Sequence, residues 1–300
     1  MNISGSEGLV AAGNIFMGMT ESPVLIKNYL PTMNRSEIFL VMVSGMGTIA
    51  GSVMGTYIGM LGGTDPAAKV LFATHLLSAS VMAVPGSIVL AKMLCPQTEE
   101  ATDHVAISGK EKENSNILDA ISSGTVTGVK LMTNIAAMLL VFISLVALAN
   151  YITEGVIGRY TGLNDWIVKI TDGKAQGLTF QFILGVITSP FMWLIGVPSQ
   201  DIMLVGSLLG QKTILNEFVA YFQLQQWKDA GLFMYEKSIL MSTYILCGFA
   251  NISSIGILLG GLGVLAPEKR GLISRIGVPA MIGGALVSVL SATIIGMILG

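Results

Sequence analysis

Long apolar runs follow one another along this 300-residue chain. A helix needs roughly 20 residues to cross about 30 Å of hydrocarbon, which is near the length of each run. The runs are residues 38–61, 70–94, 131–151, 178–197, 202–222, 239–265 and 272–299. Charged residues make up only 11% of the chain, against about 25% in soluble domains. The sequence therefore predicts an all-α integral membrane protein.

Two segments place a carboxylate inside apolar sequence. Glu21 lies in residues 18–23 (GMTESP), and Glu217 lies in residues 210–218 (GQKTILNEF). A charge at membrane depth is costly and persists where it faces a cavity or a substrate path, so both are candidates for a functional site. The alternative is that each lies at a membrane surface and pairs with Lys27 or Lys212.

The same order of features occurs in both halves of the chain. A turn, an acidic residue, a polar link and an interrupted apolar span follow one another from residue 18 and again from residue 210. Interrupted segments at corresponding positions in two halves predict a transport site near the middle of the membrane. We expect residues 9–16 to form half of a re-entrant hairpin, and residues 178–197 and 202–222 to form the arms of another.

Small polar residues mark the interruptions. Asn251 and Ser254 lie in residues 247–256 (CGFANISSIG), where Phe249 offers an apolar face for a flat ring. The alternative for the serines is a hydrogen bond back to their own helix. Asn14 and Thr48 are candidate ligands for a hard cation, because amide, hydroxyl and freed carbonyl oxygens suit Na⁺. Helix capping is the alternative for both.

The remaining polar residues favour no enzyme. The chain has no spaced nucleophile and base, metal cluster or phosphate loop. Its net charge of −2 provides no basic field, so nucleic acid is not an expected partner. We interpret His75 as a hydrogen-bonded structural residue, and Asp201 either as a cap for the following helix or as a ligand contact.

Four motifs resemble those of the concentrative nucleoside transporter family. They are residues 14–23 (NIFMGMTESP), 196–201 (GVPSQD), 205–221 (VGSLLGQKTILNEFVAY) and 247–256 (CGFANISSIG). The resemblance runs in order along essentially the whole chain. It implies a homotrimeric, cation-coupled nucleoside symporter that is multi-pass in the lipid bilayer of the bacterial plasma membrane (inner membrane). Two re-entrant hairpins, each followed by a broken helix, would form a transport domain of inverted-repeat type that moves against a trimeric scaffold.

The resemblance also implies two sets of site residues. The substrate would contact Met19, Thr20, Glu21, Val53, Glu217, Phe249, Asn251 and Ser254. Sodium would bind the side chains of Asn14 and Thr48 and backbone carbonyls near Met17 and Ile49. Na⁺ is the expected coupling ion in preference to H⁺, with no other cofactor. Met19 stands where some relatives carry Gln, so the preference between purine and pyrimidine bases stays open.

The resemblance divides the chain into three segments. We expect residues 1–95 to hold the second arm of the first hairpin, a broken helix and a full transmembrane helix. Residues 96–177 would hold a polar loop, an interfacial helix and a long scaffold-type helix, and residues 178–300 the second hairpin, a broken helix and the last transmembrane helix. Family members have several helices before the point that matches Met1, so we expect the C-terminal part of a transporter. The alternative is a truncated or split module that transports nothing without a separate N-terminal part.

Overall fold

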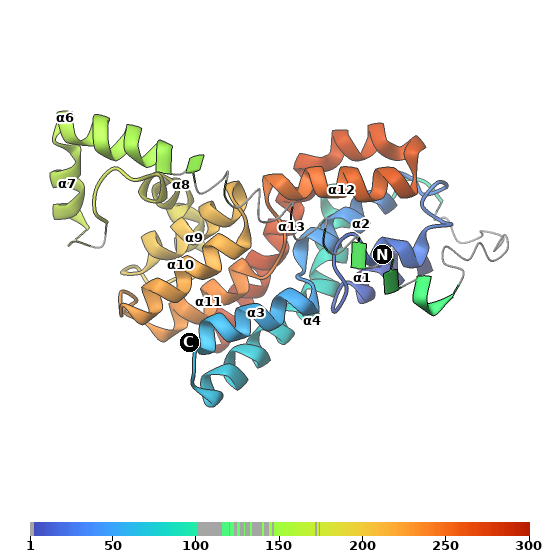
Figure 1. Cartoon of the computed structure of the whole chain (residues 1–300), viewed down its shortest axis with the longest axis horizontal. Helices are drawn as coiled ribbons and strands as arrows, with labels where there is room; N and C mark the ends of the chain where they lie inside the picture. Colours follow the sequence, from blue (N-terminus) through green and yellow to red (C-terminus); the bar gives the residue numbers. More distant parts are fainter. Residues whose placement is uncertain are drawn as a thin grey trace. The chain divides into compact units, whose positions relative to one another are not determined.

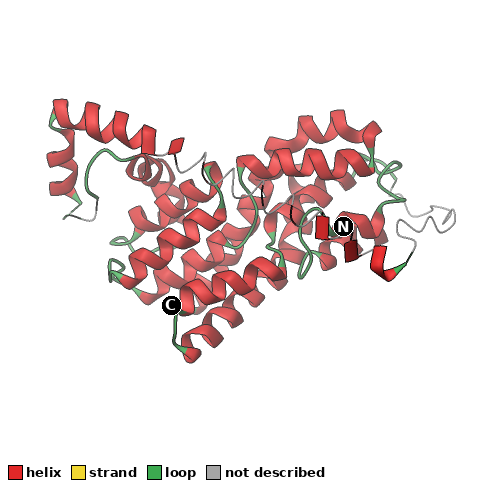
Figure 2. Cartoon of the chain, viewed as in Figure 1, coloured by secondary structure: helices red, strands yellow, loops and turns green. Residues whose placement is uncertain are grey.

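The computed structural model describes residues 3–100, 116–119, 121–122, 125–126, 129, 133, 140, 144–145, 147–171, 173 and 175–300. Within these residues the regular structure is entirely helical, as Figure 2 shows, which confirms the predicted all-α fold class. The chain forms two compact units, one of Met1–Val105 and Gln181–Gly300 and the other of Ala106–Phe180. The helices are labelled in Figure 1.

The first half of the larger unit contains a short helical turn, a broken helix and a long helix. Its helices are α1 (Gly5–Gly13), the 3₁₀-helix η1 (Ser22–Ile26), α2 (Arg35–Gly47), α3 (Gly51–Gly62) and α4 (Pro66–Leu94). Both α1 and α2 begin with a capping box, formed by Ser4 with Glu7 and by Asn34 with Glu37. These boxes satisfy backbone donors that a helix start leaves unpaired.

The second half of the unit repeats this order. It contains α8 (Phe180–Leu194), α9 (Ile202–Ile214), α10 (Glu217–Asp229), α11 (Glu236–Leu246), α12 (Ile252–Leu265), the 3₁₀-helix η3 (Pro267–Lys269) and α13 (Arg270–Ile298). The helix pair α9 and α10 corresponds to α1 and η1, the broken pair α11 and α12 to α2 and α3, and α13 to α4. The internal repeat predicted from the sequence is therefore present in the order of the helices.

The second hairpin is divided differently from the sequence prediction. The run 202–222, expected to be one arm, ends its first helix at Ile214 and starts α10 at Glu217. Asn216 causes this restart, because its side chain accepts a hydrogen bond from the Val219 N–H and caps the new helix. Helix α8 packs closely on α9, where a Cβ at Gly185 would lie 2.9 Å from the Met203 carbonyl oxygen.

Among the described residues, three stretches are long and apolar enough to cross a membrane. They are Arg35–Gly62, Pro66–Leu94 and Pro267–Ile298. The first of them contains the break between α2 and α3. Helix α13 packs against α2, α4, α11 and α12, so it joins the two halves of the unit. The contact with α2 is close, because a Cβ at Gly284 would lie 2.7 Å from Met46 Cβ.

The smaller unit is described in its C-terminal part. It contains the π-helix η2 (Tyr151–Gly158), the short helix α6 (Arg159–Thr161) and α7 (Leu163–Ile170). Gly162, in the left-handed region at φ +72°, separates α6 from α7. Most of the predicted long helix 131–151, and much of the predicted interfacial helix before it, lie outside the described residues.

Candidate functional site

The two broken helices meet at their breaks. The chain is extended at Thr48, whose carbonyl oxygen accepts a hydrogen bond of 3.2 Å from the Phe249 N–H in the break between α11 and α12. Gly248 makes the approach possible, because its φ is +150° and a Cβ there would lie 2.9 Å from the Met46 carbonyl oxygen. A side chain would be strained at this position. The breaks therefore bring the unpaired backbone groups of several helix ends together.

Glu217 lies buried near this meeting point, with 7% of its surface exposed. Its carboxylate accepts a hydrogen bond of 2.9 Å from Asn251 Nδ2 and one of 3.3 Å from the Tyr57 hydroxyl. Tyr57 belongs to α3, Glu217 is the first residue of α10, and Asn251 precedes α12. Three helices from both halves of the repeat thus contribute to one polar cluster. A buried carboxylate needs such donors.

The Asn251 amide is oriented by its role as a helix cap. Its Oδ1 atom accepts hydrogen bonds from the Ser254 N–H (2.9 Å), the Ser254 hydroxyl (3.0 Å) and the Ser253 hydroxyl (2.6 Å). With the oxygen facing the start of α12, the NH₂ group is directed to Glu217. The serines therefore support Asn251 and do not bond back to a preceding helical turn, which was the alternative considered from the sequence.

The turn at residues 14–21 lies between α2 and α12. A Cβ at Gly45 in α2 would be 2.8 Å from Met19 Cβ, and a Cβ at Gly261 in α12 would be 3.0 Å from Thr20 Cγ2. The turn is also fixed to the start of α3, because the Gly51 N–H donates to the Phe16 carbonyl oxygen over 2.9 Å. The absence of side chains at these glycines therefore lets the turn at residues 14–21 pack closely against the two broken helices.

Other predicted substrate contacts lie in the same region or near it. Val53 is half-buried on α3, one turn before Tyr57, and Phe249 is half-buried in the second break. Glu21, by contrast, is exposed, and its carboxylate accepts a hydrogen bond from the Gly18 N–H in its own turn. None of the hydrogen bonds of the described residues joins Glu21 to Glu217.

The predicted cation ligands surround the end of α2. Asn14 is fully buried, and its Nδ2 atom donates to the Ser44 hydroxyl over 3.0 Å. Its Oδ1 atom has no hydrogen-bond partner among the described residues. The buried Thr48 hydroxyl donates to the Ser44 carbonyl oxygen over 2.9 Å. Ile49 is buried in the break and Met17 is half-buried in the turn.

This arrangement suits a hard monovalent cation. An unpartnered buried amide oxygen is costly unless a positive group meets it. The carboxyl end of α2 carries partial negative charge, and freed carbonyls at such helix ends are ligands for Na⁺ in transporters. Asn14 and Thr48 supply oxygens without a formal charge. The donor set therefore fits the ion that the resemblance implies.

Sequence reasoning did not identify Tyr57 or Ser44. Tyr57 is the only tyrosine in the glycine-rich residues 51–62, and it stacks on Tyr221 with ring centroids 4.1 Å apart. A polar-tipped aromatic residue in an otherwise small and apolar segment was the available signal. Ser44 offered none, because a serine in an apolar helix ordinarily bonds to its own backbone.

His75 and Asp201 have structural partners. His75 Nδ1 lies 3.1 Å from the Tyr244 hydroxyl, which joins α4 to α11. Asp201 precedes α9, but its buried carboxylate accepts hydrogen bonds from the Met234 N–H (3.0 Å) and the Tyr235 N–H (3.1 Å). It therefore supports the start of α11 and not that of α9.

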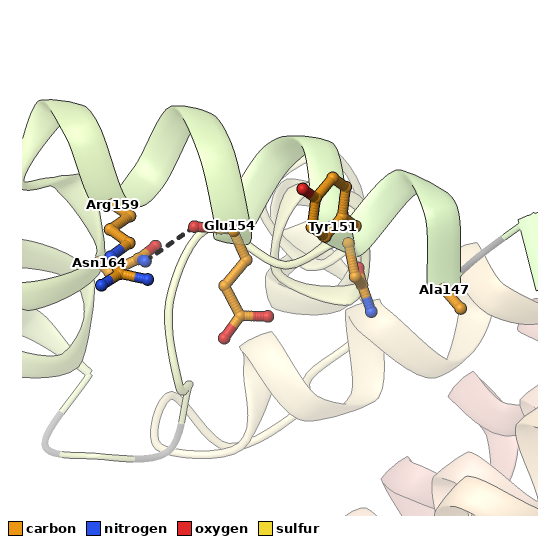
Figure 3. Close-up of a pocket in the computed structure, with 7 residues that line it drawn as sticks. Ala147, Tyr151, Glu154, Arg159 and Asn164 are labelled. Atoms are coloured by element: carbon orange, nitrogen blue, oxygen red, sulfur yellow. Dashed lines mark hydrogen bonds between the residues drawn. The ribbon is translucent and has the colours of Figure 1, made fainter.

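The smaller unit has a pocket of its own, shown in Figure 3. Its volume is about 370 Å³, and it lies beside η2. The Asn164 Nδ2 atom donates to the Glu154 carbonyl oxygen over 3.0 Å at its edge. The lining residues are Ala147, Asn150, Tyr151, Glu154, Gly155, Arg159 and Asn164. None of them belongs to the predicted sites.

Comparison with known proteins identifies the family. Residues 75–296 match the family described as Na⁺ dependent nucleoside transporter C-terminus. The chain is also 39% identical over 303 residues to an uncharacterized transporter of Haemophilus influenzae, covering 100% of this chain and 67% of that protein. The chain belongs to the concentrative nucleoside transporter family. Members of this family are transporters and not enzymes.

Two further comparisons extend the likeness within the nucleoside transporter family. The chain is 39% identical over 312 residues to sodium/nucleoside cotransporter 1 of Rattus norvegicus, covering 99% of this chain and 45% of that protein. It matches the structure of the transporter CNTnw in an inward-facing substrate-bound state with a TM-score of 0.81 and 36% identity, covering 98% of this chain and 65% of that one. The chain thus spans about two thirds of CNTnw and under half of the rat protein. With the apolar helices, these matches identify a multi-pass membrane protein.

Proposed function

We propose that this chain takes part in symport of nucleosides driven by a cation gradient, with Na⁺ as the coupling ion in preference to H⁺. The observation that carries the proposal is the buried Glu217 carboxylate, which Tyr57 and Asn251 hold where the breaks of two helices meet. Family membership supports the same conclusion, because relatives are named sodium/nucleoside cotransporters.

The substrate side of the proposal rests on what a carboxylate can bind. An ionised carboxylate only accepts hydrogen bonds, with room for about four, and Glu217 receives two from side chains, those of Tyr57 and Asn251. A ribose offers hydroxyl donors for the remaining positions. Phe249 in the adjacent break would cover a face of the base, and Met19, Thr20, Val53 and Ser254 would line the space around it. Glu21 would contribute from the neighbouring turn.

The preference for Na⁺ over H⁺ rests on the chemistry of Asn14 and Thr48. A proton needs a basic group to hold it, and neither an amide nor a hydroxyl side chain takes up a proton near neutral pH. A cation, by contrast, needs only oxygen lone pairs. The unpartnered Asn14 Oδ1 atom, next to the freed carbonyls of the break, provides them. Carbonyls near Met17 and Ile49 would complete the site.

The assembly and location belong to the proposal as well. We infer a homotrimer in the plasma membrane of a bacterium, with residues 96–177 contributing to the scaffold and the two halves of the repeat forming the moving transport domain. The grouping of residues 1–105 and 181–300 into one compact unit supports the second part of this division.

Uptake of radiolabelled uridine into transporter-deficient cells tests the proposal. A Na⁺ gradient should drive accumulation, and choline should not replace it. Glu217→Gln removes a charge-assisted bond of roughly 1.5–3 kcal/mol, so uridine affinity should fall about tenfold or more. Glu236→Gln is the matched control, because Glu236 is also the first residue of a helix but is exposed. Unchanged affinity in the Glu217 variant, or equal affinity for uridine and uracil, would contradict the proposal.

A further inference from the structure

Lys212 is a fully buried lysine in the last turn of α9. Its ammonium donates to the Ile245 carbonyl oxygen over 2.8 Å and to the Ser288 hydroxyl oxygen over 2.9 Å. The Ser288 hydroxyl in turn donates to the Ala285 carbonyl oxygen over 2.9 Å, so its lone pairs remain available to Lys212. A buried charge is tolerated when it is paired and hydrogen-bonded in this way.

The position of Ile245 shows which helix end the Lys212 ammonium contacts. Helix α11 ends at Leu246, so the Ile245 carbonyl is among those that a helix end leaves without an intrahelical partner. Helix carboxyl ends carry partial negative charge, which a cation stabilises. Lys212 therefore supplies a positive charge to the first half of a broken helix.

In the first half of the repeat, a neutral side chain contacts the corresponding helix end. Asn14 follows α1 as Lys212 completes α9, and each reaches the last turn of the first half of a broken helix. Asn14 contacts Ser44 in the last turn of α2, but its amide oxygen has no partner among the described residues. The end of α11 is thus contacted by a cationic side chain, whereas the printed contact at the end of α2 comes from a neutral amide.

We propose that Lys212 is a tethered cation that occupies, in the second half of the repeat, the place that a diffusible Na⁺ takes beside Asn14 in the first half. This proposal rests on the proposed function. It assigns a stoichiometric role to the lysine: the second broken helix carries its cation on a side chain, so a single exchangeable cation is coupled to each nucleoside. Lys212 acts as a positioning residue for the α11 end, through its contacts with Ile245 and Ser288, and it does not need to touch the substrate.

Removal of the ammonium should create a second site for a diffusible cation. Lys212→Ala leaves a cavity beside the Ile245 carbonyl and the Ser288 hydroxyl, which are hard oxygen ligands. Lys212→Met removes the charge but fills the space, so it should gain no such site. Lys228→Ala is the matched control, because Lys228 also donates to a carbonyl in the last turn of a helix, that of Leu61 in α3, over 2.7 Å. It lies far from either break in sequence and is partly exposed.

Thermal unfolding of the purified full chain provides the measurement. Midpoints are recorded while NaCl or methylammonium chloride replaces choline chloride at constant ionic strength. The number of Na⁺ ions taken up on folding, given by the slope of stability against the logarithm of Na⁺ concentration, should rise from about 1 in the unaltered protein to about 2 in Lys212→Ala. Methylammonium should raise the midpoint of Lys212→Ala alone. Lys212→Met and Lys228→Ala should take up the same number of Na⁺ ions on folding as the unaltered protein.

The outcomes separate this inference from the proposed function. If the unaltered protein responds to Na⁺ and transports uridine, but Lys212→Ala gains no response to either cation, the tethered-cation role is wrong. That role is equally wrong if Lys212→Ala cannot be obtained folded in any of the three salts, because a cation should replace the lost ammonium. If the unaltered protein responds neither to Na⁺ nor to uridine, the proposed function itself fails.

Discussion

The Phe249 N–H donates to the Thr48 carbonyl oxygen over 3.2 Å, which joins the breaks of two helices that are about 200 residues apart in sequence. Thr48 belongs to the predicted cation site and Phe249 to the predicted substrate site. We therefore expect a change in the backbone at one break to affect the other. This contact provides a structural basis for coupling between an ion and a nucleoside, because each ligand would favour the same arrangement of the two breaks.

Thr48→Ala should weaken the coupling of nucleoside binding to Na⁺. Coupling free energies between two ligands are typically 1–3 kcal/mol, so replacing Na⁺ by choline should lower uridine affinity by roughly 5- to 150-fold in the unaltered protein. Loss of the Thr48 hydroxyl would remove one of the proposed oxygen ligands and should reduce that ratio several-fold. Equilibrium binding of uridine in each salt measures it.

The matched control for Thr48 is Thr74→Ala. Both hydroxyls donate over 2.9 Å to the carbonyl oxygen four residues earlier, but Thr74 is exposed on α4. The control should leave the ratio of affinities unchanged. Uptake that follows a pH gradient and ignores Na⁺ would show instead that protons are the coupling ion.

Tyr57→Phe should weaken uridine binding, whereas Tyr221→Phe should not. The Tyr57 hydroxyl holds the Glu217 carboxylate at 3.3 Å, near the long limit for a hydrogen bond, so we expect a loss of about threefold to tenfold in affinity. Tyr221→Phe is the control in the same stacked pair. Its hydroxyl donates over 2.8 Å to the Thr243 carbonyl oxygen.

The two tyrosine variants should therefore differ in uridine affinity. Tyr221→Phe leaves a buried carbonyl without its partner, which should cost about 1 kcal/mol of stability, with no change in uridine affinity. Calorimetric binding and thermal unfolding of both variants distinguish the effects. A stability loss without an affinity loss in Tyr57→Phe would assign that hydroxyl to packing alone.

Sequence patterns were most informative where a polar residue interrupts an apolar run. Asn251 and Thr48 could be recognised in this way, because a broken transmembrane helix must leave backbone groups to be satisfied. The structure brings Asn251 together with Glu217, which lies in the other predicted polar segment. The order of helices in the repeat could be predicted for the same reason.

Partners across the fold could not be predicted. Lys212 was considered from the sequence as a partner for Glu217, five positions away, yet its ammonium binds groups on α11 and α13. Capping of its own helix was one expectation for Asp201, yet its carboxylate reaches the start of α11. Local spacing limits which neighbours a side chain can reach, whereas these contacts depend on how distant helices pack.

Gly248→Ala should be strongly destabilising. The residue has a φ of +150°, and a Cβ would lie 2.9 Å from the Met46 carbonyl oxygen and 3.1 Å from Gly47 backbone atoms. Backbone strain of this kind costs of order 1–3 kcal/mol before the clash is counted. Gly256→Ala in α12 is the control, because a Cβ there meets nothing within 4 Å. It should be neutral or stabilising, since Ala favours a helix over Gly by about 1 kcal/mol.

The midpoint of thermal unfolding compares the two glycine variants. Gly248→Ala should lower it and Gly256→Ala should not. The Gly248 variant should also bind uridine more weakly in Na⁺, because it forces the two breaks apart. A Gly248 variant as stable as the Gly256 variant would show that the backbone at the break adapts without cost.

Asp201→Ala should destabilise the protein although Asp201 lies outside the predicted sites. Its buried carboxylate accepts from two backbone N–H groups at the start of α11, and each buried donor left unpaired costs roughly 1–3 kcal/mol. Asp201→Asn keeps one acceptor oxygen and should have an intermediate effect.

Asp229→Ala is the control, because Asp229 is exposed and forms an ion pair of 3.2 Å with Lys228 at the surface, an interaction worth about 0–1 kcal/mol. The midpoint of thermal unfolding should therefore be highest for Asp229→Ala, intermediate for Asp201→Asn and lowest for Asp201→Ala. If Asp201→Asn is as stable as the unaltered protein, the charge of the carboxylate is not what holds the α8–α9 loop to α11.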